Sequence, residues 1–350
     1  MKNRLLPLLL LSFLAIGCQS DNLEFIEIPL SGSVNEVPNL NIRELKLGHS
    51  PELMAMATQV EKIDNEFYIF DPKATKKTMF VFSEDGKFVT DFAFKGRGRG
   101  EVVFPFSFFI ANDAVNIVDI SSYNLASYSL NDENEFISTK KLPFSGMSAV
   151  ATNGDEILWN IMIHPSNTEN KFVDYCYLTT TSDSLTPEKG ILKQTVFIGT
   201  MNTGANNVYK VGDDVHFTDR QRKSIYTLNN GVEEEVYRMT YGNFEFAPIS
   251  LLNKISAGSG NVSNSDWKPE YIRNYFLYET EESILATFIA NRRKYIAMYN
   301  KETDDSFMVP LAEFCDKIGY KISHFANTVD NSFVAVVEND DANPTLLFIK

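Results

Sequence analysis

Apolar and polar residues alternate in short runs along most of this chain, and turn residues separate the runs. Six segments share one order: a turn residue, an apolar run, a polar break and a second alternating run. They begin at Glu66, Ala114, Glu156, Asp214, Ser283 and Ser332. Alternation with a period of two is typical of strands that are half-buried in a sheet. The 27 Phe and 15 Tyr residues favour the same structure. The pattern therefore predicts an all-β protein.

The spacing of the six segments predicts the architecture. Their starts recur at intervals that bracket the roughly 40–50 residues of a four-stranded propeller blade, with two longer intervals. Each segment supplies the middle strands of a blade, and its neighbours supply the inner and outer strands. The expected inner strands include Ala149–Thr152, Val208–Val211 and His324–Val329, and an expected outer strand is Phe88–Phe94. We predict a six-bladed β-propeller, with a β-sandwich or a pair of sandwiches as the alternative.

The sixth segment ends at Lys350, one strand short of a complete blade. An open ring would expose sheet edges at its seam, so a strand from elsewhere should close it. The N-terminal run Leu23–Leu30 alternates between apolar and polar residues, and no other blade claims it. We expect this run to be the outer strand of the last blade.

One region departs from the alternation. Phe244–Asn274 contains a cluster of Gly, Ser and Asn and lies between the fourth and fifth blades. It is best interpreted as a long inserted loop, with a helical turn at Ser250–Ile255. Long loops on rigid scaffolds often carry function, although many are simply tolerated.

The N-terminus has the pattern of an export signal. Lys2 and Arg4 precede an apolar stretch, Leu5–Ile16, which is shorter than the roughly 20 residues that span a bilayer. The following Gly17-Cys18 resembles a bacterial lipobox, in which the cysteine is lipidated. We therefore expect a signal peptide at 1–17, a lipidated tether at 18–22 and a propeller at 23–350, with a plain signal peptide as the alternative. The lipid would anchor the protein to the outer membrane, on a side that the sequence leaves open.

Net charge limits the classes of binding partner, and cysteine content limits the disulfides that the chain can form. The formal net charge is −14, which disfavours nucleic acid and anionic membrane surfaces. Besides Cys18, the chain has Cys176 and Cys315, which fall in separate units of the predicted ring. We expect two buried thiols and no disulfide.

A glycine-rich segment, KGRGRGE at Lys95–Glu101, first suggests a phosphate loop. No Lys-Ser/Thr pair and no helix follow it, so this interpretation fails. Its place between an outer strand and Val102–Ile110 indicates a crossover from one blade to the next, where glycines permit a sharp turn.

This G-x-G-x-G-E crossover, behind a lipoprotein signal and among aromatic strands, resembles the six-bladed β-propeller lipoproteins of Bacteroidota-type bacteria, which are related to NHL-repeat propellers. Members of that family usually have proline where this chain has Arg99. The resemblance implies the fold, the cell envelope and an association with outer-membrane nutrient importers. It implies no reaction.

The chain shows no pattern that is typical of catalysis or of a cofactor. Its four histidines are scattered over different blades without the spacing of a zinc site. Asn339–Asn343 could form a calcium loop, but it lacks the glycine and distal glutamate of an EF-hand, so an acidic turn is the better interpretation. We predict no metal and no cofactor.

One constellation of charges could bind a ligand. Loops between second and third strands lie on the same face of a propeller as the crossovers, and these loops concentrate basic residues. The residues that we predict at this site are Asp71, Arg97, Arg99, Glu101, Asp119, Asp219, Arg220, Arg292 and Arg293. They would form a positively biased funnel for carboxylated, sulfated or phosphorylated ligands. The alternative is structural, with the carboxylates capping turns and pairing with arginines.

Three functions remain open at this point. The first is a non-catalytic lipoprotein that binds a glycan, a peptide or a partner protein. The second is a polysaccharide lyase or glycoside hydrolase, which needs converging carboxylates. The third is a protein–protein adaptor that uses Phe244–Asn274 as its contact.

Overall fold

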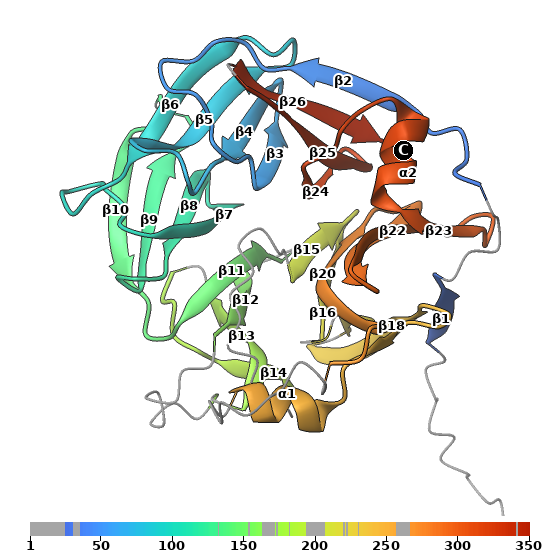
Figure 1. Ribbon diagram of the computed structural model, residues 1–350. Coiled ribbons are helices and arrows are strands. Elements are labelled where there is room, and N and C mark those ends of the chain that lie inside the picture. The colour runs from blue at the N-terminus through green and yellow to red at the C-terminus, as the bar shows by residue number, and fades with distance from the viewer. Residues whose placement is uncertain are drawn as a thin grey trace, which may run out of the picture.

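The computed structural model describes residues 25–30, 36–131, 133–152, 155–162, 172, 174–181, 183–193, 207–219, 221, 223–229, 231–256, 267–340 and 342–350. Within them, six antiparallel sheets stand around a common axis (Figure 1). The prediction of a six-bladed propeller is confirmed. The two short helices, α1 (Ile249–Ser256) and α2 (Leu311–Ile318), both lie in crossovers between blades.

Blades 1 to 3 are each built from four strands in sequence order, from the axis outward. Blade 1 comprises β3 (Gln59–Ile63), β4 (Glu66–Phe70), β5 (Lys77–Ser83) and β6 (Phe88–Phe94); blade 2 comprises β7 (Pro105–Ala111), β8 (Ala114–Asp119), β9 (Asn124–Ser129) and β10 (Phe136–Lys141). Blade 3 comprises β11 (Gly146–Ala151), β12 (Glu156–Ile161), β13 (Tyr175–Thr181) and β14 (Lys189–Lys193).

The other three blades carry additional or borrowed strands. Blade 4 comprises β15 (Val208–Val211), β16 (Asp214–Thr218), β17 (Ser224–Asn229) and β18 (Val232–Thr240), with β1 (Ile26–Pro29) added to its outer edge. Blade 5 comprises β20 (Tyr271–Glu279), β21 (Ser283–Ala290), β22 (Arg293–Asn300) and β23 (Ser306–Pro310), with β19 (Glu245–Phe246) beside β20. Blade 6 comprises β24 (His324–Val329), β25 (Ser332–Asn339), β26 (Ala342–Ile349) and β2 (Ile42–Lys46).

The ring is closed by an N-terminal strand, but not by the one that we expected. β2 pairs antiparallel with β26, with Leu45 opposite Leu346, and completes blade 6. Leu23–Leu30 instead contributes β1, which runs parallel to β18 on blade 4. The closing strand must lead into blade 1 through an ordinary crossover, and Ile42–Lys46 directly precedes that crossover. Three of its five residues, Arg43, Glu44 and Lys46, are charged and exposed, and they hid the alternation in the sequence.

The predicted insertion is partly regular. It contains β19 and α1, so the helical turn expected at Ser250–Ile255 is present. β20 begins at Tyr271, and the last four residues of the predicted insertion therefore belong to the inner strand of blade 5.

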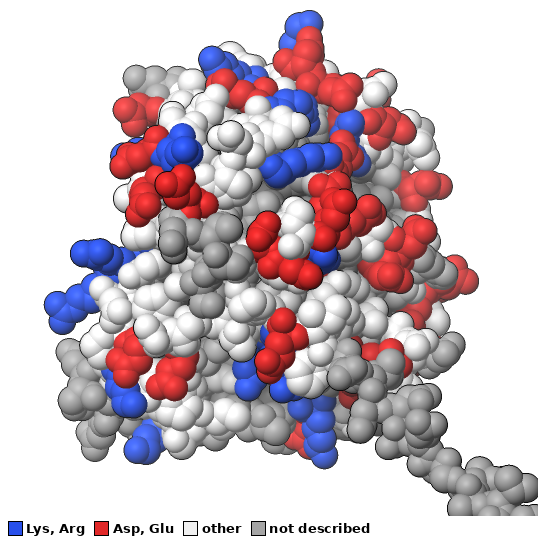
Figure 2. Space-filling view, turned by 90° about the vertical axis from the view of Figure 1, so that its right-hand side faces the viewer, with Lys and Arg blue, Asp and Glu red and all other residues white. Residues whose placement is uncertain are grey.

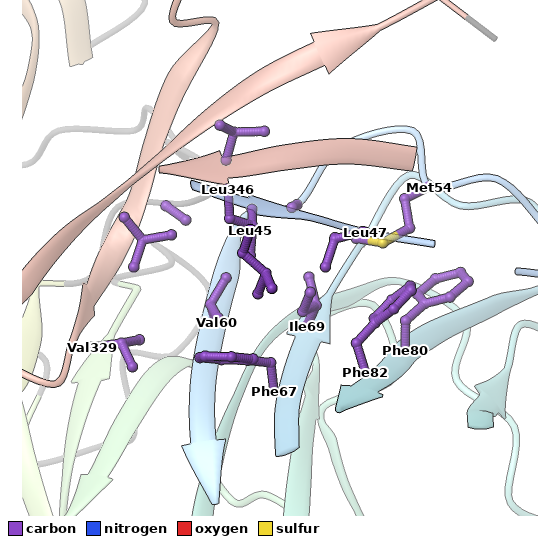
Figure 3. Packing of buried hydrophobic residues seen from close by; sticks show 14 of the residues in the cluster. Leu45, Leu47, Met54, Val60, Phe67, Ile69, Phe80, Phe82, Val329 and Leu346 are labelled. Carbon is purple, nitrogen blue, oxygen red and sulfur yellow. The ribbon is translucent and has the colours of Figure 1, made fainter. Parts of the chain in front are cut away.

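A hydrophobic layer fills the space between each pair of neighbouring blades. Figure 3 shows the layer at the closure, where Leu45 and Leu346 of blade 6 lie against Val60 and Ile69 of blade 1. Val60, Ile69 and Leu346 have no exposed surface. Burying a side chain of this size contributes about 1.5–3 kcal/mol, so the borrowed strand is held by packing as well as by its ladder.

Side chains also join the inner strands, which form no sheet with one another. The Asn327 amide in blade 6 bonds to the backbone N–H and carbonyl of Val60 in blade 1, at 2.9 and 2.7 Å. The Gln59 amide in blade 1 bonds to both backbone groups of Phe108 in blade 2 in the same way. Both amides are buried, so these bonds satisfy groups that would otherwise be costly. They fix the spacing of the blades around the axis.

Candidate functional site

The carboxylates at the ends of second strands hold the crossovers in place. Asp71, at the end of β4, has no exposed surface and accepts four backbone N–H bonds. Two come from Ala55 and Met56 in the crossover that enters blade 1, and two from Lys73 and Ala74 in the loop after β4. The contacts of Asp71 are those of the structural alternative that we gave in the sequence analysis.

Asp119 is the equivalent residue at the end of β8. It accepts bonds from Val103 and Phe104 in the preceding crossover and from Ser121 and Ser122 in its own loop. Burial opposes its ionisation, but these hydrogen bonds outweigh burial and hold the pKa of Asp119 below its ordinary value. In blade 4, Asp219 is half-buried and accepts a bond from the N–H of Lys223.

The glycine-rich crossover folds around Glu101. The Glu101 carboxylate accepts the N–H of Gly98 at 2.7 Å, and a Cβ at Gly96 would lie 1.9 Å from the same carboxylate. Gly100 has a φ of 73°, and a Cβ there would meet the ring of Phe136 at 2.8 Å. The glycines are therefore required by close packing, and no phosphate cradle is formed.

The predicted arginines have different surroundings. Arg97 is exposed on this crossover, and Arg99 lies over the ring of Phe136 at 5.8 Å. Arg220 lies outside the described residues. Arg292 and Arg293 are exposed at the turn between β21 and β22, where Arg292 has a φ of 60°. The predicted residues thus surround the crossover face and do not converge on one point.

A cavity on the crossover face lies between blades 5 and 6. It has a volume of about 180 Å³ and mostly apolar walls, among them Phe276, Phe288, Tyr295, Leu311 and Ile322. Phe288 and Tyr295 stack at 5.5 Å, which makes one wall flat and rigid. We call this cavity the seam pocket.

Irregularities in two inner strands shape the seam pocket. The register of β20 against β21 shifts between Arg273 and Phe276, and Asn274 in this bulge has a φ of 46°. The register of β24 against β25 shifts after Phe325. Bulges re-aim side chains and are frequent beside binding sites. Here they place Asn274, Phe276 and Phe325 in the lining.

A groove along α2 continues the seam pocket outward. The groove shares Lys294, Leu311 and Ile322 with the pocket and is also lined by Arg293, Tyr320 and Lys321. α2 starts directly after β23 and ends at Gly319, whose φ of 77° turns the chain back toward β24. Its Phe314 is fully buried and stacks on Phe307 at 6.1 Å, so the helix is anchored to blade 5.

Cations stand at the junction of the pocket and the groove. Arg293, Lys294 and Lys321 are exposed, and in the described part of the chain none of them takes part in an ion pair. The groove lining also includes the carboxylate of Asp316, so three cations stand beside one anion. Figure 2 views the side of the molecule on which α2, β23 and β1 lie in Figure 1, and it shows acidic side chains over much of the upper part, with basic side chains among them. The junction therefore carries a local excess of positive charge on an acidic protein.

His324 contributes a neutral polar group to the lining. Its Nε2 lies 2.6 Å from the carbonyl oxygen of Ala57, which can only accept, so Nε2 carries a proton. Burial lowers the pKa of His324, although the bond to Ala57 acts in the opposite direction. The positive charge near the pocket at neutral pH therefore comes from Lys294 and its neighbours.

Comparison with known proteins establishes the family. The profile of a family described as "6-bladed beta-propeller" matches residues 50–336. The chain belongs to this family. No curated protein matches the chain.

Solved structures show the same fold. A Bacteroides fragilis protein named "Putative exported protein" superposes with a TM-score of 0.82 at 22% identity, over 93% of this chain and 99% of that one. A streptogramin B lyase (TM-score 0.48, 11% identity, 89% and 98% coverage) and the virginiamycin B lyase of Staphylococcus aureus with quinupristin (0.47, 11%, 89% and 99%) are more distant. At these identities the similarity concerns the fold alone.

The seam pocket was missed in the sequence, apart from Arg293 at its edge. Its walls include residues of β20, β21, β22, α2 and β24, which no local pattern links. Two signals were available: a helix-like run at Leu311–Ile318, and the Gly319-Tyr320-Lys321 turn that follows it.

Other predictions concern features away from the pocket. Cys18 lies outside the described residues. No disulfide joins Cys176 in β13 to Cys315 in α2; Cys176 is buried as expected, whereas Cys315 is only half-buried. No described helix is long and apolar enough to cross a membrane. Over the same residues, no group of three or more metal-ligating side chains is found.

Proposed function

We propose that this propeller is a non-catalytic lipoprotein of the cell envelope that binds an acidic, partly apolar ligand at the seam pocket. The observation that carries the proposal is the junction of an apolar cavity with three exposed cations that form no ion pair with any described residue. An apolar cavity with a few convergent polar groups is the usual form of a small-ligand site.

The geometry suggests how such a ligand would be held. An aromatic or aliphatic group would enter between Phe276 and the stacked Phe288–Tyr295 pair. A carboxylate on the same ligand would lie in the α2 groove within reach of Arg293 or Lys321, where charge-assisted hydrogen bonds are strong. Acidic peptides with aromatic residues carry both features, whereas uronic-acid glycans carry the carboxylate and offer the C–H face of a sugar ring as their apolar surface.

Binding without conversion fits the remaining chemistry. The three carboxylates that the sequence offers for catalysis, Asp71, Asp119 and Asp219, do not line the seam pocket, and the oxygens of Asp71 and Asp119 accept bonds from backbone N–H groups of the crossovers. The seam pocket itself is lined by no carboxylate. No observation favours the lyase, hydrolase or adaptor hypotheses over binding.

The test is a thermal-shift panel on the full-length protein in detergent. We expect acidic aromatic peptides or oligouronates to raise the melting temperature, and the ligand to be recovered intact. The variant Arg293→Ala/Lys294→Ala should lose the shift, whereas Lys87→Ala should keep it, because Lys87 lies in the hairpin between β5 and β6 on the opposite face. Cleavage of the ligand would contradict a non-catalytic role, and an equal shift in the double variant would exclude the seam.

The proposed envelope location rests on two observations. One is the lipobox-like pattern that ends at Cys18, and the other is the similarity in fold to a protein named as a putative exported protein. Mass spectrometry of the mature N-terminus should find a lipid on Cys18. The variant Cys18→Ser should leave the membrane fraction, and its retention there would contradict the anchor.

A further inference from the structure

A second cavity follows the axis of the ring. All six inner strands contribute to its lining, and its volume is about 310 Å³. It shares only Tyr278 with the seam pocket. We call it the axial cavity.

Opposite charges stand on opposite walls of the axial cavity. Glu61 lies on β3 of blade 1 and Lys210 on β15 of blade 4, and these two blades face each other across a ring of six. Neither residue takes part in an ion pair with any described residue. The two side chains line the same cavity without pairing, although Lys210 is near enough for its charge to act on the Glu61 carboxyl group.

The other carboxylate and amide side chains of the lining already form hydrogen bonds or ion pairs. Gln59 and Asn327 bond to the backbone of the neighbouring blades. Glu279 has a fully buried side chain and binds Tyr209, His216 and Lys301 at 3.0, 2.9 and 2.6 Å. Glu61 and Lys210 are thus the charged groups of the lining that are left for a ligand.

The environment of Glu61 favours a bound cation. Burial raises the pKa of this carboxyl group to about 7, while Gln59 and Lys210 act in the opposite direction. A carboxylate in a poorly solvated site gains from a nearby positive charge. Between the two charged walls, Phe109, Ile110 and Leu277 provide apolar surface.

We infer that the axial cavity binds a short peptide with both termini free. The terminal ammonium would lie against Glu61, the terminal carboxylate against Lys210, and small apolar side chains against Phe109 and Leu277. A free amino acid carries both charges on one carbon, whereas each added residue separates them by up to about 3.8 Å. Charges on opposite walls therefore favour a dipeptide or tripeptide.

The test is calorimetric titration of the full-length protein with alanyl-leucine, its N-acetyl form, its C-terminal amide and free leucine. We expect the free dipeptide to bind at least about tenfold more tightly than each of the other three probes, a difference of about 1.4 kcal/mol. Equal affinities for the free and blocked dipeptides, or no binding of the free dipeptide, would overturn the inference. Tighter binding of leucine would overturn the assigned length.

Two variants assign the ends. Glu61→Gln should abolish the preference for a free amino terminus and keep the preference for a free carboxylate. Lys210→Met should do the reverse, and because Lys210 is exposed, this variant tests the inference even if Glu61→Gln impairs folding. Preferences unchanged in Lys210→Met would contradict the assignment. Arg293→Ala/Lys294→Ala should leave dipeptide affinity unchanged, which separates this inference from the seam pocket.

Discussion

The crossover face uses charged residues in two different ways. Around blades 1 and 2, Asp71 and Asp119 each accept four backbone N–H bonds, Glu101 accepts one from Gly98, and all three hold loops together. At the seam of blades 5 and 6, Arg293 and Lys294 project beside an apolar cavity and form no ion pair with any described residue. The role of a charged residue at a strand end therefore depends on the groups that it contacts.

The largest expected effect on stability concerns the carboxylates that hold loops together. Asp71→Ala leaves four backbone N–H groups without an acceptor, and we expect it to lower the free energy of unfolding by at least about 3 kcal/mol. Urea unfolding measures this. Asp85→Ala, on an exposed hairpin, is the matched control and should change stability little; equal effects of the two would refute the clamp.

A smaller effect is expected for the bonds between inner strands. Asn327→Ala removes both bonds to Val60 and should cost about 1–3 kcal/mol, because buried backbone groups lose their partner. Asn229→Ala is the comparison, since Asn229 is exposed and its amide bonds to the Glu234 side chain within the same blade. If chemical denaturation finds the same midpoint for Asn327→Ala and wild type, the side-chain link between blades contributes nothing.

Acid should distinguish a saturated carboxylate from an ordinary one. The folded-state pKa of Asp119 is lowered, so its stabilising contribution is complete above the unfolded value of about 3.9 and is lost as pH falls through the folded pKa. The stability difference between wild type and Asp119→Asn should therefore shrink with acidification below about pH 4. A difference that stays constant or grows in that range would show that the carboxylate is not preferentially ionised in the fold.

The smallest effect on stability is expected at the seam. Arg293→Ala/Lys294→Ala removes exposed charges without ion pairs to described residues, and the free energy of unfolding should change by no more than about 0.5 kcal/mol. A larger loss by thermal unfolding would mean that these residues serve the fold, as Asp71 does, and the contrast between the two regions would disappear.

The sequence predicted the fold well because the fold is local and repeated. Alternation along single strands was enough to place β6, β15 and β24 at their observed bounds. Ring closure was assigned to the wrong strand because it requires pairing between distant segments. The composition of Ile42–Lys46 does not show which distant strand it pairs with. The sequence indicated that Asp71 and Asp119 lie at the ends of strands. It did not indicate that backbone N–H groups occupy their carboxylates.

The seam pocket could not be predicted from the sequence, for a physical reason. Its wall of Phe276, Phe288 and Tyr295 depends on a bulge in β20, and its opening depends on where α2 returns to β24. The bulge interrupts the alternation of β20, and a crossover has no alternation of its own, so the pattern that revealed the blades could place neither of them.

The most direct test of the central claim is photo-crosslinking. An acidic aromatic peptide that carries a benzophenone group would be irradiated with the full-length protein, and the attachment site mapped by mass spectrometry. The seam account predicts attachment within Leu311–Ile322 or Phe276–Tyr295, and its loss when unlabelled peptide competes. Attachment at Asp71–Glu101, with the seam unlabelled, would contradict it.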